Sequence, residues 1–406
     1  MRSLLAVFFL SLAFLVHAQQ DPDAARRTVE QIENLLKQRP TDATLWFYLS
    51  RFRSELGDVK GSTEALEKVA ELGDGYLPST GIGGFDRAWD DPAFKAVVAR
   101  IEAKLPRLDF APNEFEIEDR ELIPEGLAYD ARAGNFYLGS VAKRKILRID
   151  ANKAVTEFAG AAAALDAVLG MTVDTPRRRL YAVSTSALTD AGRKRLRNSV
   201  VVFDVDTGRL LRRHEVASAA QLNDVTIAFG GAVYVSDSEN GAVYELLAEA
   251  APRTVIAPGQ IRGTNGIAAS PDGKRLYVGH STGLAVIDAA AGTWKRVTNR
   301  TRESIAGIDG LYEYHGDLVA VQNVTTPGRV IRITLSRDGD EVIGVNTVVS
   351  HHHSSLNEPT TGAVRADNGY FYLLAATGVT HFARSGKIER PEAVPNPVVL
   401  RALLSR

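Results

Sequence analysis

Four residues with side-chain oxygen atoms stand at equivalent positions of a repeated strand-turn-strand pattern. Each lies just before a glycine or an aspartate, as in "TNGIAASPDGKRLYVG", where Asn265 precedes Gly266. The four are Glu125, Asn223, Asn265 and Asp309, and two further repeats carry Leu169 and Thr361 at this position. Carboxylate and carboxamide oxygens are the ligands that hard divalent cations prefer. The pattern therefore predicts one metal ion where these positions converge.

Two carboxylates mixed with two neutral amides suit Ca²⁺, with Mg²⁺, Mn²⁺ or Zn²⁺ as the alternatives. No imidazole or thiol stands at the aligned positions, and the chain contains no cysteine, which argues against copper and makes zinc the least favoured of these alternatives. A structural reading is the other interpretation, since Asn, Asp and Glu also start strands and cap turns. Four such residues in register across separate repeats favour the metal site.

The elements that must position these residues are six copies of a strand, a tight turn and a second strand. The copies recur every 42–54 residues. Repeats of about 40–50 residues built from short strands are typical of a β-propeller, whose inner strands border a central channel. The sequence predicts a mainly β fold with a six-bladed β-propeller over residues 113–390 and a C-terminal tail at 391–406. Residues 115–122 are expected to supply the outer strand that closes the ring.

The N-terminal part of the chain follows a different pattern. Residues 1–18 have the positive start, apolar run and small exit residue of a secretory signal peptide. Residues 20–105 have helical periodicity with a break at Gly57, and their spacing resembles a tetratricopeptide (TPR) helix pair. We expect this small α-helical domain to cap the propeller, with a protein-docking surface as the alternative. The protein is thus predicted to be periplasmic or secreted, with no membrane span after signal cleavage.

The propeller sequence resembles the SMP-30/gluconolactonase/regucalcin (LRE-like) family of six-bladed β-propellers. The resemblance covers roughly residues 113–390 and rests on "PEGLAYD", "LNDVTI", "TNGIAASPDGKRLYV" and "GIDGLYE". It implies that Glu125, Asn265 and Asp309 bind one divalent ion in the channel. It further implies that Asn223 binds the ion or orients substrate, and that Asp309 is also the general base. Because members of this family hydrolyse lactones, the resemblance implies a metal-dependent hydrolase of lactones or related esters, which the signal-like residues 1–18 predict to be exported.

Three further features stand near these motifs. Asp224 follows Asn223 as in paraoxonase-like propellers, where such an aspartate helps to hold a second Ca²⁺; because Gly126 stands at the matching place after Glu125, Asp224 is expected to support the first site. His280 ends the second strand of the fourth copy and is read as a partly buried strand residue or as a neighbour of the site. The histidines at 351–353 are expected in a solvated loop, with a proton-transfer histidine or adventitious metal binding as the alternatives.

The charge and the remaining motifs limit the classes of partner. A formal net charge of −1 gives no reason to expect nucleic acid. No Gly-x-Ser-x-Gly elbow accompanies the serines, so a serine hydrolase is not expected. The predicted partner is a small lactone or ester, with a protein partner of the helical domain as a further candidate. A non-catalytic propeller that binds a ligand or a protein is the alternative function.

Overall fold

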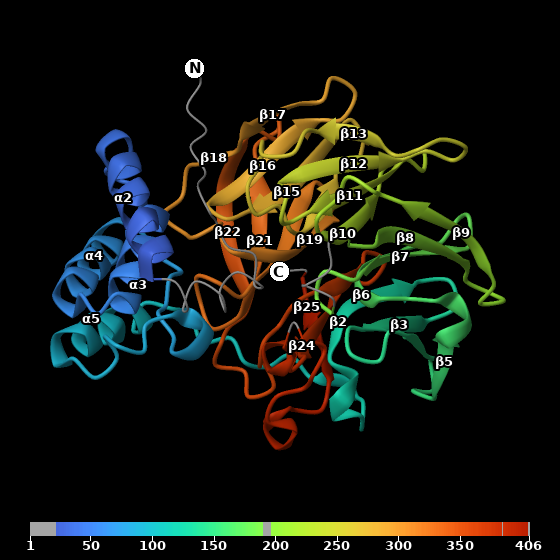
Figure 1. The fold of residues 1–406 in the computed structure, drawn as a ribbon, viewed down its shortest axis with the longest axis horizontal. Helices are drawn as coiled ribbons and strands as arrows, with labels where there is room; N and C mark the ends of the chain where they lie inside the picture. Colours follow the sequence, from blue (N-terminus) through green and yellow to red (C-terminus); the bar gives the residue numbers. More distant parts are fainter. Residues whose placement is uncertain (1–21, 190–195, 384, 405–406) are drawn as a thin grey trace.

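A ring of six β-sheets and a group of N-terminal helices make up the computed structural model (Figure 1). The structure describes residues 22–189, 196–383 and 385–404, so the predicted signal peptide lies outside the described residues. Among the helices of this described part, none is both long and apolar enough to cross a membrane. The predicted fold class, a six-bladed β-propeller preceded by a small helical domain, is confirmed.

Each blade is a sheet that begins at the channel and ends at the outside of the ring. The inner strands contact one another around the channel; they are β2 (Pro124–Asp130), β6 (Ala167–Asp174), β10 (Leu222–Ile227), β14 (Ile267–Ala269), β19 (Ile308–Tyr314) and β23 (Gly362–Arg365). The second strands pair antiparallel with them; they are β3 (Asn135–Ser140), β7 (Arg179–Thr185), β11 (Val233–Asp237), β15 (Arg275–His280), β20 (Asp317–Gln322) and β24 (Tyr370–Ala376).

The third and fourth strands complete the blades. The third strands are β4 (Ile146–Ile149), β8 (Asn198–Asp204), β12 (Ala242–Leu246), β16 (Gly283–Asp288), β21 (Arg329–Leu335) and β25 (Val398–Leu403). The fourth strands are β5 (Val155–Ala159), β9 (Leu210–Glu215), β13 (Arg253–Ile256), β17 (Thr293–Arg296), β22 (Glu341–Val349) and β1 (Asn113–Glu116). A short strand, β18 (Thr298–Asn299), lies parallel to β22.

The two ends of the propeller sequence meet in the sixth blade, where β1 pairs with β25. The predicted closure of the ring by the segment that precedes the first repeat is therefore seen. The prediction of a C-terminal tail at residues 391–406 is wrong, because residues 398–403 form the third strand of this blade. Most of their apolar side chains are buried, as Leu400 shows with an exposed fraction of 0 % in the cluster that it shares with β24.

Glycines allow the inner strands to approach one another closely. A Cβ atom on Gly126 would lie 2.0 Å from the carbonyl oxygen of Leu169 on the next inner strand. A Cβ atom on Gly266 would lie 2.5 Å from the carbonyl oxygen of Asp309. Because no side chain fits at these distances, the repeated glycine of the sequence pattern is a requirement of the narrow channel.

Four helices form the N-terminal domain: α2 (Pro22–Gln38), α3 (Ala43–Glu55), α4 (Val59–Leu72) and α5 (Pro92–Glu102). Aspartates cap three of them, since Asp42, Asp58 and Asp91 accept backbone N–H bonds at the starts of α3, α4 and α5. The predicted break at Gly57 is confirmed, because its φ of +82° allows the chain to turn between α3 and α4. Short 3₁₀ turns are η1 (Gly81–Gly83), η2 (Arg120–Leu122), η3 (Ala161–Ala163), η4 (Val379–His381) and η5 (Pro391–Ala393).

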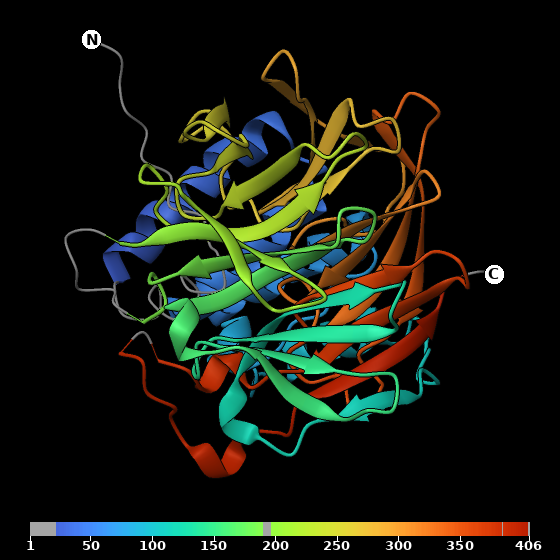
Figure 2. The same cartoon turned by 90° about the vertical axis from the view of Figure 1, so that its right-hand side faces the viewer.

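The helical domain packs against the fourth and fifth blades. The Tyr48 hydroxyl donates to the carbonyl oxygen of Ser281 at 2.7 Å, and Leu77 N donates to the carbonyl oxygen of Thr325 at 2.8 Å. Figure 2 shows the helices on one side of the ring, behind the strands. Since Ser281 and Thr325 follow the second strands β15 and β20, the helices lie at the end of the propeller where these strands finish.

Candidate metal centre in the channel

Three of the four predicted metal ligands lie close together at one end of the channel. Glu125 is the second residue of β2 and Asp309 the second residue of β19, whereas Asn265 lies just before β14. The Asn265 Nδ2 group donates to Asp309 Oδ1 at 2.7 Å. Burial and the nearby charge of Asp309 both raise the pKa of Glu125, as expected for two carboxyl groups that lie close together. Asn223 occupies the matching place on β10 and is buried.

Asp309 is held by two carboxamides. Asn323 Nδ2 donates to Asp309 Oδ2 at 2.6 Å and to the carbonyl oxygen of Pro359 at 2.8 Å. Together with the bond from Asn265, this arrangement fixes both carboxylate oxygens of Asp309. Each asparagine therefore directs its amide nitrogen toward Asp309, which leaves its own Oδ1 atom available for another partner.

Three buried oxygen atoms of this group have no hydrogen-bond partner among the described residues: Glu125 Oε2, Asn265 Oδ1 and Asn323 Oδ1. A buried acceptor without a partner destabilises a fold by about 1–3 kcal/mol. All three atoms are acceptors, and they belong to residues that lie next to the Asp309 carboxylate. A divalent cation with oxygen preference is the group that such a set fits.

The electrostatics of the channel favour the same conclusion. Burial, together with the neighbouring charges of Asp309 and Asp224, raises the pKa of Glu125 well above its usual range. Burial also raises the pKa of Asp309 to about 6, although the hydrogen bonds from its two asparagines oppose the rise. Carboxyl groups that repel one another in a buried space lose this penalty when a cation binds between them.

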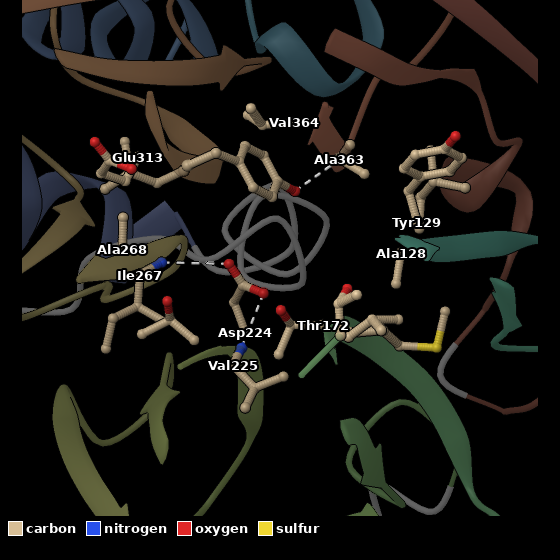
Figure 3. Close-up of a pocket in the computed structure, with 18 of the residues that line it drawn as sticks. Ala128, Tyr129, Thr172, Asp224, Val225, Ile267, Ala268, Glu313, Ala363 and Val364 are labelled. Carbon is tan, nitrogen blue, oxygen red and sulfur yellow. Dashed lines mark hydrogen bonds between the residues drawn. The ribbon is translucent and has the colours of Figure 1, made fainter. Parts of the chain in front are cut away.

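Asp224 occupies the position at which the other five repeats carry glycine. Its side chain reaches toward the channel axis, where Oδ1 accepts from Val225 N at 2.9 Å and Oδ2 from Ile267 N at 3.3 Å (Figure 3). Burial raises the pKa of Asp224 to about 7. Asp224 also lines a cavity of about 260 Å³ in the channel, together with Thr172 and Glu313. It thus connects the ligand group with the rest of the channel.

A small cavity lies on the other side of the ligand group, and the helical domain contributes to it. Asn265, Asn323, His280 and Tyr48 line this cavity. His280 is buried, and burial lowers its pKa to about 3, so the imidazole is neutral at physiological pH. Its Nδ1 accepts from Thr282 N at 3.4 Å, while Nε2 has no partner among the described residues. His280 is therefore a buried neighbour of the ligand group.

Asn323 and Tyr48 are site residues that sequence reasoning missed. Asn323 follows the second strand of the fifth repeat, much as His280 ends the second strand of the fourth. A polar residue at this recurring place was the signal that could have identified it. Tyr48 comes from α3, and its position beside Asn265 depends on the packing of two domains, for which the repeat pattern holds no signal.

Comparisons with known proteins relate part of the propeller to one family model. The model of the SMP-30/Gluconolactonase/LRE-like region matches residues 123–313. No curated protein sequence matches the chain significantly. Solved structures share the fold at low identity, and three of them span different functions.

The PQQ-bound aldose sugar dehydrogenase from Streptomyces coelicolor is 14 % identical, with a TM-score of 0.51 over 73 % of this chain and 99 % of that one. The calcium-binding protein regucalcin from Agrobacterium tumefaciens is 17 % identical, with a TM-score of 0.50 over 74 % of this chain and 98 % of that one. A gluconolactonase from Xanthomonas campestris is 15 % identical, with a TM-score of 0.49 over 74 % of this chain and 99 % of that one. Over residues 123–313 the propeller is therefore similar to the SMP-30/Gluconolactonase/LRE-like region.

Proposed function

We propose that this protein is a divalent-metal-dependent hydrolase of lactones or related esters, with the reaction at the channel site. The observation that carries the proposal is the group of partnerless buried oxygens on Glu125, Asn265 and Asn323 around the Asp309 carboxylate. The match of residues 123–313 to the SMP-30/Gluconolactonase/LRE-like model supports the same class of reaction.

Glu125, Asn265 and Asp309 would hold the ion, with Asn223 as a further ligand or a contact to substrate. Asn323 adds a carboxamide oxygen that was not part of the predicted set. Ca²⁺ is the proposed ion, because the donors are oxygens alone and the similar Agrobacterium protein is described as calcium-binding. Mg²⁺, Mn²⁺ and Zn²⁺ remain the alternatives to be compared in the same assay.

A bound cation supplies a Lewis acid that polarises the ester carbonyl and acidifies a water molecule. Asp309 accepts the proton of the attacking water, whose oxygen forms a bond to the carbonyl carbon. The ester C–O bond then breaks, and the proton passes from Asp309 to the leaving alkoxide oxygen.

The test is turnover of a panel of lactones by the full mature chain, before and after chelation and with each metal restored. Asp309→Asn should reduce kcat by about 10²–10⁴-fold, the usual contribution of a general base. Glu313→Gln is the matched control, because Glu313 lies on the same strand, further along the channel. Glu313→Gln should keep full activity.

Two outcomes oppose the proposal. Full lactone turnover by Asp309→Asn would refute the role of this residue as the base. Ion binding without hydrolysis of any lactone or ester would favour the non-catalytic propeller instead.

We also propose that the chain is exported, on the basis of the signal-like residues 1–18. Localisation of the full-length chain by cell fractionation, compared with a chain that lacks residues 1–18, tests this. Retention of the full-length chain in the cytoplasm would contradict it. We further propose that the helical domain binds a protein partner. The test is whether a protein that co-purifies with the wild type is lost from variants of the helical domain.

A further inference from the structure

A turn that carries adjacent histidines joins the propeller to the helical domain. The turn follows β22 in the fifth blade and spans residues 350–353. His351 Nε2 lies 3.6 Å from Glu102 Oε1, the carboxylate of the last residue of α5. The rings of His351 and His352 are 4.0 Å apart. One ligand atom from each of these three residues lies within 4.8 Å of the other two.

The surroundings of the turn hold it in place. Ser350 N donates to the carbonyl oxygen of Leu108 at 2.9 Å, and Leu108 N donates to Ser350 Oγ at 3.0 Å. His353 Nε2 lies 2.7 Å from the carbonyl oxygen of Ala111, and His353 is buried. The expectation of a solvated loop is therefore wrong for this turn, because it packs against the segment that links α5 to β1.

We propose that Glu102, His351 and His352 form a binding site for a transition-metal ion, Zn²⁺, that fastens α5 to the propeller. Two imidazoles and one carboxylate are a ligand set that zinc takes in proteins, with a fourth position open to water. The channel group offers oxygen atoms, with the single imidazole of His280 beside it, whereas the turn carries two adjacent imidazoles. The two sites thus select different ions by the softness of their donors.

The geometry of the cluster fits the ion. Zinc–ligand distances of about 2.0–2.2 Å in a tetrahedron place two ligand atoms about 3.3 Å apart. The separation of 3.6 Å between His351 Nε2 and Glu102 Oε1 is close to this value. The His351 Nε2 atom is also buried without a hydrogen-bond partner among the described residues.

The second imidazole is oriented from outside the cluster. Ser350 Oγ lies 3.1 Å from His352 Nδ1. A hydrogen bond on one ring nitrogen fixes the direction of the other, as partners of metal-bound histidines do in known sites. Nε2 of His352 is thereby the atom left to bind the ion. Adjacent residues of a strand point to opposite faces of the sheet and could not share one ion, but His351 and His352 lie in a turn.

The experiment is a calorimetric titration of the untagged mature chain with Zn²⁺, in buffer with enough Ca²⁺ to saturate the channel. One Zn²⁺ per chain should bind, and the thermal unfolding midpoint should rise with it. Co²⁺ in place of Zn²⁺ should give the absorption bands of a site with nitrogen and oxygen ligands. His351→Gln should lower the Zn²⁺ affinity more than about 100-fold, since even residues that only support a ligand contribute 10–100-fold.

His315→Asn is the matched control, because His315 is exposed on a turn distant from α5 in the sequence, and it should leave Zn²⁺ binding unchanged. Glu102→Gln provides a second test that does not depend on a buried side chain, as 49 % of the Glu102 side chain is exposed. Zinc affinity that is equal in wild type, His351→Gln and Glu102→Gln would overturn the proposal. Absence of Zn²⁺ binding by the wild type would overturn it as well.

Discussion

The channel centre and the histidine turn differ in how the chain assembles them. The channel centre takes equivalent positions from successive repeats, and the ring brings these positions together around one axis. The histidine turn takes two adjacent residues from a loop and Glu102 from another domain. Residues at equivalent positions of a repeat can therefore be predicted from the sequence to share a site. A site at the junction of two domains is recognised only in the folded structure.

The largest expected effect is a loss of Ca²⁺ affinity when one ligand of the channel centre is substituted. Glu125→Gln removes a negative charge from the channel and should weaken Ca²⁺ binding more than about 100-fold, with a comparable loss of lactone turnover. Zn²⁺ binding at the turn should not change, because Glu125 lies on β2 in another blade. Separate calorimetric titrations with Ca²⁺ and Zn²⁺ measure both effects.

Glu121→Gln is the control for this substitution, since 69 % of the Glu121 side chain is exposed and it lies four residues before Glu125. It should retain both affinities. If Glu125→Gln weakened both ions equally, the idea of two independent sites would be wrong.

The second prediction concerns the close packing of the inner strands, on which the channel centre depends and the histidine turn does not. Gly126→Ala places a methyl group 2.0 Å from the carbonyl oxygen of Leu169, so an inner strand must move. We expect the free energy of unfolding to fall by about 3 kcal/mol, as for other overpacked interiors. Chemical denaturation followed by circular dichroism measures the change.

Gly344→Ala provides the comparison on an outer strand, where the nearest atom to the added methyl group is 3.4 Å away. This variant should lie within about 0.5 kcal/mol of wild type. Equal destabilisation by both substitutions would show that the narrow channel does not explain the repeated glycine.

Much of the fold followed from the sequence because the repeats share one spacing. The six inner strands and the closing strand were predictable, but β25 was not. A long loop separates Ala376, the end of β24, from Val398, so the third strand of the last blade falls outside the spacing of the other copies. The pattern of strand and turn held no information on how long this loop would be.

The candidate site divides in the same way. Glu125, Asn265 and Asp309 were found because their places are fixed by register within the repeat. Asn323 and Tyr48 were missed because their roles come from side-chain packing across blades and domains. The histidines were misread because their neighbour Glu102 is distant in sequence.

The third prediction uses the burial of Asp224 in the channel, which, with a smaller contribution from the charge of Asp309, raises the pKa of this carboxyl group. In the metal-free protein, the pKa of Asp224 is about 7, whereas an aspartate in an unfolded chain has a pKa of about 3.9. The folded state therefore binds more protons between these values, and its stability falls as the pH rises through them. Chelated protein should lose about 2 kcal/mol through Asp224 between pH 5.5 and 7.

Denaturation of chelated wild type and Asp224→Asn at several pH values tests this. The substitution should reduce the loss, and Ca²⁺ should restore stability to the wild type at pH 7. A pH dependence that is identical in Asp224→Asn and wild type would contradict the assignment.

The smallest expected effect concerns α3, the helix through which the helical domain reaches the channel centre. Tyr48 donates to the carbonyl oxygen of Ser281 and lines the cavity beside Asn265. Tyr48→Phe should lower the free energy of unfolding by about 1 kcal/mol, the usual effect of losing one hydrogen bond. It should also raise KM for the preferred lactone about threefold at unchanged kcat, since Tyr48 contacts none of the proposed reacting groups.

Tyr76→Phe is the matched control, because the Tyr76 hydroxyl makes a buried hydrogen bond with Thr44 Oγ1 at 2.7 Å within the helical domain. It should cost a similar amount of stability without any change in KM. If both variants change KM equally, the helices affect the channel only by stabilising the propeller. If Tyr48→Phe alone changes KM, the helical domain forms part of the substrate site, and the domain junction contributes to the channel centre as well as to the histidine turn.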